Sequence, residues 1–144
     1  MPAHRLAALQ DLVLNAFMAD AKHYQIDIAV RTAFLADQSD LEAGRYVFAY
    51  TITITNTGTV AAQLISRHWI ITDADGDAQE VRGLGVVGHQ PLLAPGEHFE
   101  YTSGCALATA VGTMKGTYQM TAEDGLQFEA PIAEFVLSMP RTLH

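Results

Sequence analysis

The sequence predicts an all-β fold in which two layers of antiparallel strands enclose one core. Three observations support this prediction. Apolar and polar side chains alternate over long stretches, which is the pattern of strands with one buried face. Turn signals such as Asn-Thr-Gly and Asp-Gly separate these stretches. The chain has 144 residues and a single cysteine, so it is long enough to bury one core without disulfides.

The segment Tyr46–Asn56 is expected to be the central strand. Aromatic and aliphatic side chains occupy every second position from Tyr46 to Ile54, and small or β-branched residues lie between them. A strand with such a face is not stable alone, because a second layer must cover its apolar side chains. The neighbouring segments should therefore also be strands.

Further strands are predicted where the chain alternates in the same way or lies between turn signals. They cover residues 24–34, 63–73, 78–82, 98–104, 113–122 and 126–139, with a polar loop at 36–45, a hairpin turn at 73–77 and a long loop at 83–96. Ile65, Trp69 and Ile71 are expected on one face, with Trp69 as a core anchor. The alternation changes phase near Pro131, which predicts a β-bulge or a crossing between sheets. About seven or more such strands are typical of an immunoglobulin-like or fibronectin type III-like β-sandwich.

Residues 1–19 differ from the rest of the chain. Leu6, Leu9 and Val13 recur at helical spacing, so this N-terminal extension is expected to be either a short amphipathic helix or a disordered segment. The β pattern begins directly afterwards, and the predicted domain covers residues 20–144.

The composition restricts the class of protein. Sixteen acidic residues against eight basic ones give a formal net charge of −8, which disfavours nucleic acid as a partner. The sequence has neither an apolar run of the ~20 residues that a membrane span needs nor a signal-peptide pattern. Cys105 cannot form an intramolecular disulfide, and nothing indicates an oxidising compartment, so we expect a cytoplasmic protein.

Several motifs stand out from the alternating pattern. They include Phe34-Leu-Ala-Asp-Gln-Ser-Asp40, Arg67-His68-Trp69, Glu80-Val-Arg-Gly-Leu-Gly-Val-Val-Gly-His-Gln-Pro91 and Gly112-Thr-Met-Lys-Gly116. In combination they resemble the ApaG family, and the similarity runs from about Ala19 to the C-terminus.

The resemblance implies a fibronectin type III-like β-sandwich in a bacterial protein. Members of the family, also called CorD, are associated with cobalt resistance and magnesium efflux. The same domain is appended to eukaryotic F-box and polymerase-interacting proteins, where it resembles a protein-interaction module. The family brings no established catalytic residues and no cofactor, although its link to divalent cations leaves a bound cation open. We therefore do not expect an enzyme.

The glycines Gly83, Gly85 and Gly88 spell the motif GxGxxG, with Arg82 and His89 beside them. In a dinucleotide site these glycines join a strand to a helix whose N-terminal amides face the phosphate. Prolines interrupt the segment that follows, so such a helix is not expected. Two hypotheses remain: a loop of backbone amides that holds a phosphate or nucleotide, and a loop that only packs against the sandwich.

Four carboxylates lie close together at Asp73, Asp75, Asp77 and Glu80. Clustered oxygen ligands suit magnesium or calcium, but the spacing is not that of an EF-hand. A solvated hairpin turn is the alternative. None of the six histidines has a partner at a typical ligand spacing, so structural histidines are favoured over a cobalt site.

The sequence thus leaves two classes of function. The favoured class is a non-catalytic module that binds another protein and acts as an accessory factor in divalent-cation tolerance. The alternative is a small-ligand binder, with phosphate or nucleotide at residues 82–89 or a cation at residues 73–80. The chain is expected to be a monomer or a homodimer formed through a sheet edge.

Overall fold

The computed structural model describes residues 9–10 and 21–141. In this part of the chain, long strands follow one another with short connections, and a single 3-10 turn at Ala36–Gln38 lies in the first loop. The strands are β1 (Ile26–Phe34), β2 (Tyr46–Asn56), β3 (Ala62–Asp73), β4 (Ala78–Leu84), β5 (Leu92–Leu93), β6 (His98–Leu107), β7 (Val111–Ala122) and β8 (Gln127–Ser138).

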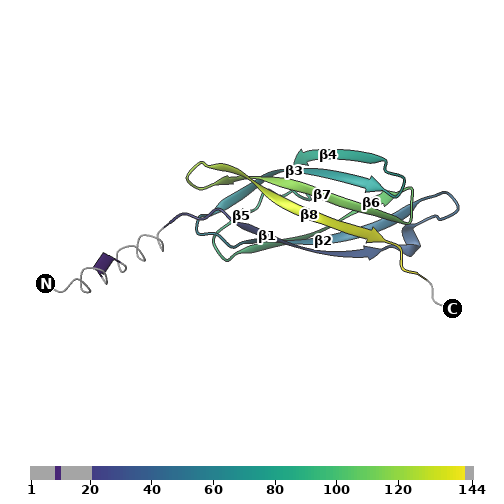
Figure 1. The fold of residues 1–144 in the computed structure, drawn as a ribbon, viewed down its shortest axis with the longest axis horizontal. Coiled ribbons are helices and arrows are strands. Elements are labelled where there is room, and N and C mark those ends of the chain that lie inside the picture. Colours follow the sequence, from purple (N-terminus) through teal and green to yellow (C-terminus); the bar gives the residue numbers. More distant parts are fainter. Residues whose placement is uncertain (1–8, 11–20, 142–144) are drawn as a thin grey trace.

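The strands form two antiparallel sheets that pack face to face (Figure 1). One sheet has the order β1-β2-β6, with β2 in the centre. The other has the order β4-β3-β7-β8, and the short β5 pairs with β3 as well. The predicted β-sandwich is confirmed, and β2 is a central strand because both of its edges are paired.

The core lies between the two sheets and is rich in aromatic side chains. Phe48, Ile52 and Ile54 of β2 are buried on alternate positions, as the sequence predicts. Trp69 of β3 is also buried, and its ring lies 5.7 Å from that of Tyr50 in the opposite sheet. The prediction that Trp69 anchors the core is confirmed, because its edge-to-face contact with Tyr50 joins the two sheets and a second one, with Tyr118 of β7, lies within its own sheet.

Two β-bulges change the phase of the strands. The pairing of β7 with β8 shifts between Met114 and Gly116, opposite the residues that follow Ile132. This shift confirms the predicted change near Pro131. A second shift, between Leu64 and Ser66, makes one prediction wrong: Ile65 does not share the core face of Trp69. Leu64 is fully buried instead, whereas Ile65 is only half-buried.

The predicted bounds of one strand and one loop differ from those of the structure. The strand expected at 78–82 extends to Leu84, and the segment predicted as a long loop at 83–96 contains β5. The hairpin turn predicted at 73–77 is confirmed by the antiparallel pairing of β3 with β4. Apart from residues 9 and 10, the extension predicted at 1–19 lies outside the described residues. Within residues 9–10 and 21–141, no helix is long and apolar enough to cross a bilayer.

Candidate functional site

The glycine motif forms the end of β4 and a tight hairpin rather than a strand-to-helix loop. The amide groups of Val86 and His89 donate to each other's carbonyl oxygens, at 2.8 and 2.9 Å. Both residues between them have positive φ, 48° for Val87 and 79° for Gly88. This is the geometry of a type I′ turn. The amide of Gly85 donates to the carbonyl of Ile65, so two amides of the motif and that of the adjacent His89 are already bonded within the chain.

Val87 occupies the first central position of this turn under strain. It is the one non-glycine residue of the described part with positive φ. A β-branched side chain is unfavourable in this conformation, and type I′ turns prefer Asn or Gly there. The Val87 side chain is nevertheless 58% exposed, so burial does not compensate for the strain.

Gly83 gives Arg67 room to cross β4. A Cβ atom on Gly83 would lie only 2.8 Å from three guanidinium atoms of Arg67, so the guanidinium lies against the Gly83 backbone. It then donates to the carbonyl oxygens of Leu84 and Gly85, at 3.0 and 2.9 Å. Arg67 was not predicted as a site residue. The sequence does contain a signal for it: Arg67 is charged and lies two positions before Trp69, so it shares the face of β3 that Trp69 occupies.

The structure does not bring the five residues of the predicted anion site together. Arg82 lies opposite His68 on β3 and lines the outer face of the five-stranded sheet. The ring of His89 instead packs against Phe99 of β6, with 5.6 Å between ring centroids. Gly85 contacts the backbone of His89, because a Cβ there would lie 2.4 Å from its carbonyl oxygen.

The acidic segment forms a hairpin turn around Asp73. One carboxylate oxygen of Asp73 accepts the amide groups of Asp75 and Asp77, at 2.9 and 3.0 Å. Glu80 lies further along β4, where its carboxylate is 3.8 Å from the guanidinium of Arg82. Across residues 9–10 and 21–141, no group of three or more Asp, Glu, His or Cys residues is placed to hold a metal ion.

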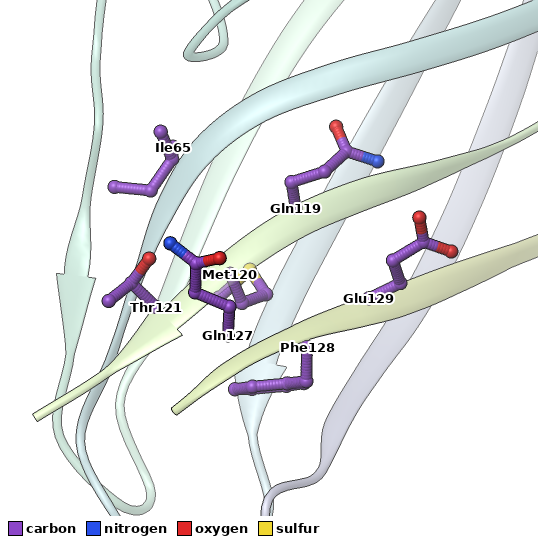
Figure 2. A pocket seen from close by; sticks show the side chains of 7 residues that line it. All are labelled: Ile65, Gln119, Met120, Thr121, Gln127, Phe128 and Glu129. Carbon is purple, nitrogen blue, oxygen red and sulfur yellow. The ribbon is translucent and has the colours of Figure 1, made fainter. Parts of the chain in front are cut away.

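Two adjoining depressions cross the outer face of the five-stranded sheet. The first, of about 300 Å³, is lined by residues of β3, β7 and β8 (Figure 2). The second, of about 450 Å³, extends over β4. They share Gln119 and Glu129, and Arg82 and Gly83 line the second. Figure 2 shows Gln119, Thr121 and Gln127 along the two neighbouring strands, with Ile65 at the side. Amides and hydroxyls therefore cover the middle of this face.

The tyrosine hydroxyls and the cysteine thiol of the core have raised pKa values. The hydroxyls of Tyr101 and Tyr118 share a hydrogen bond between the sheets, and burial raises the pKa of each above its ordinary value. Burial also raises the pKa of the Cys105 thiol to about 11. At neutral pH all three groups are protonated, so Cys105 lacks the thiolate that a nucleophile requires.

Comparison with known proteins places this geometry in a family. A family profile described as the ApaG domain matches residues 36–122. Protein ApaG of Thiobacillus denitrificans is 72% identical over 127 residues, which are 88% of this chain and the whole of that protein. Protein ApaG of Nitrosospira multiformis is 65% identical over the same shares.

Two solved structures have the same fold as this chain. The crystal structure of the putative ApaA protein from Bordetella pertussis superposes with a TM-score of 0.81 at 61% identity, over 85% of this chain and 99% of that one. The X-ray structure of another structural-genomics target gives a TM-score of 0.78 at 48% identity, over 83% of this chain and 91% of that one. The match over residues 36–122 and the full-length relatives show that this chain belongs to the ApaG family.

Proposed function

We propose that this chain is a non-catalytic module that binds another protein through an apolar surface, the loop patch, formed by Leu84, Val87 and Leu92. These side chains are 75%, 58% and 63% exposed. The main support is Val87, an exposed valine held in a conformation that asparagine or glycine would adopt at lower cost. Strain that folding does not require points to a functional constraint on the side chain.

The positions of the two leucines support the same surface. Leu84 pairs with Ser66, and Leu92 pairs with Gln63, along the same edge of β3. Leu93, the next residue of β5, is buried, so Leu92 points to the opposite side, away from the core. Grouped exposed apolar side chains on a domain with a well-packed core are typical of a protein contact.

The proposal of a non-catalytic role draws on the protonated state of Cys105 and on the absence of a reaction in the names of the relatives. An accessory role in cobalt or magnesium tolerance is part of the proposal and draws on the family resemblance. A protein partner of such a module is expected to carry an apolar segment that covers the loop patch.

The test is quantitative partner capture with a variant that is more stable than the parent. Val87→Asn creates an Asn-Gly turn, which should stabilise the fold by roughly 1 kcal/mol because the strain is relieved. Combined with Leu92→Ser, it should abolish recovery of a partner that the parent chain captures reproducibly. The control Leu41→Ser/Val136→Ser removes two exposed apolar side chains elsewhere and should retain the partner.

Two results would overturn the proposal. One is that no partner is recovered reproducibly by the parent chain. The other is that recovery is equal for the parent and for the Val87→Asn/Leu92→Ser variant. Since the Val87→Asn change favours folding, loss of binding in that variant is not explained by misfolding.

A small-ligand site is the second candidate, and one observation favours it. Arg82 and Gly83 line the larger depression on the outer face, where a phosphate or nucleotide would meet a guanidinium. The carboxylates of Glu80 and Glu129 lie in the same region, which disfavours an anion. For a cation, Asp75 and Asp77 are the exposed carboxylates of the hairpin turn.

A further inference from the structure

Strand β4 is an unpaired edge of the five-stranded sheet. Among the strands of the described residues it pairs only with β3, and Figure 1 shows it at the outside of the molecule, beyond β3. Six of its seven residues are exposed, and they include residues on both faces of the strand. The strand therefore overhangs the opposite sheet, and its outer edge is accessible for backbone pairing.

Two hydrogen bonds show which backbone groups of β4 face outward. The amide of Gly85 donates to Ile65, and the carbonyl of Asp77 accepts from Asp73. In an antiparallel pair the residues bonded to the neighbour alternate with period two. Odd-numbered residues from 77 to 85 thus face β3, and the backbone groups of Glu80 and Arg82 face the free edge.

Arg67 closes one end of this edge. Its guanidinium crosses Gly83 and donates to the carbonyls of Leu84 and Gly85. The turn at Asp73–Asp77 closes the other end. The free stretch between these two ends is centred near Val81, a β-branched residue that is 37% exposed.

We propose that β4 pairs antiparallel with β4 of a second copy of this chain, with the two-fold axis at Val81. Only registers that place outward-facing residues opposite each other allow bonding. A register centred on Glu80 puts two carboxylates opposite each other, and one centred on Arg82 puts two guanidinium groups opposite each other. The register centred on Val81 pairs each Glu80 with Arg82 of the partner copy, twice.

The consequence is a continuous sheet that crosses the dimer. Val81 faces its own counterpart at the axis, where antiparallel side chains approach closely. This pairing goes beyond the proposed function: Leu84 of the loop patch belongs to β4, but Val87 and Leu92, the positions changed to test the loop patch, lie outside it. The two proposals therefore succeed or fail separately.

A charge-exchange series measured by sedimentation equilibrium tests the register. The parent chain should form a species of twice the 15.6 kDa chain mass as its concentration is raised. Glu80→Arg and Arg82→Glu should each weaken dimerisation by about 10-fold or more, since each places like charges opposite each other twice. The double variant Glu80→Arg/Arg82→Glu should restore the parent affinity. Glu42→Arg, a charge change in the exposed first loop, is the matched control and should dimerise as the parent does.

A cross-linking experiment tests the axis directly. In a Cys105→Ala background, Val81→Cys should form an intermolecular disulfide under mild oxidation, because its counterpart lies opposite at bonding distance. Gln79→Cys, two residues away on the same strand, faces Gly83 of the other copy and should cross-link much more slowly. A parent chain that stays monomeric at all concentrations, a double variant that does not recover, or equal cross-linking at positions 79 and 81 would overturn the proposal.

Discussion

Replacement of Asn56 should strongly destabilise the sandwich, because its one side chain makes three hydrogen bonds to the backbone. Asn56, at the end of β2, is 1% exposed. Its amide nitrogen donates to the carbonyl oxygens of Val60 and Leu93, both at 2.9 Å. Its side-chain oxygen accepts the amide of Gly58, also at 2.9 Å. One side chain therefore ties the turn after β2 to the short strand β5.

The expected magnitude follows from burial of the three partners. Asn56→Ala leaves the buried Leu93 carbonyl unpaired, at about 2 kcal/mol. The Val60 and Gly58 groups are only partly buried, so water recovers most of their loss and the total is about 3 kcal/mol. Asn56→Asp should cost at least as much at neutral pH, because a carboxylate would face two carbonyl oxygens. Protonation restores a donor, so the deficit of Asn56→Asp should shrink as the pH falls.

Urea denaturation followed by tryptophan fluorescence measures this loss through Trp69, the single tryptophan. A loss of 3 kcal/mol corresponds to about 10 °C in Tm for a domain of this size. Gln127→Ala removes an exposed amide and should change the unfolding free energy by less than about 0.5 kcal/mol. The reasoning is refuted if Asn56→Ala costs no more than this control.

Three further predictions concern the glycine hairpin, the cysteine and the N-terminal edge of the domain. Gly85→Ala should cost roughly 3 kcal/mol in denaturation experiments, because its Cβ would meet a carbonyl oxygen at 2.4 Å. Gly88→Ala has open space and should cost only about 1 kcal/mol; equal losses would contradict the hairpin geometry. Cys105, with a thiol pKa of about 11, should react with a disulfide reagent at pH 8 about 100-fold more slowly than after unfolding, and a rate equal to that of the unfolded chain would contradict its burial. Hydrogen bonds from Tyr24, the Leu126 amide and Lys22 hold the pKa of Asp124 at about 2, so their stabilisation is present above its ordinary value of 3.8 and is lost as the pH falls through about 2. Tyr24→Phe should raise the pKa of Asp124 in a carboxyl NMR titration, and an unchanged value would contradict the contact.

Strand periodicity predicted the parts of the fold that depend on local pattern. The alternation in β2 and the burial of Trp69 follow from the need to cover one apolar face. The phase change near Pro131 was visible because two apolar series with different parity meet there. The bulge at Ile65 was not visible, since Ile65, Trp69 and Ile71 have a consistent parity that the inserted residue breaks.

The surface could be predicted only in part. The positive φ at Gly85 and Gly88 agrees with the turn chemistry of glycine, but the sequence could not show that Val87 shares it. The path of Arg67 across Gly83 depends on the register between two strands, which no local pattern specifies. For the same reason the sequence placed Arg82 and His89 in one hypothetical site, whereas they lie toward different sheets.

The most direct test of a protein-binding loop patch is an amide chemical-shift map of the labelled chain. Magnesium, cobalt and adenine dinucleoside polyphosphates are titrated first, and the captured partner is then added. The proposed function predicts no saturable shift with the small ligands, and shifts at residues 84–92 with the partner. Saturable shifts with a small ligand, confined to residues 82–89 or 73–80, would contradict it and favour the small-ligand site.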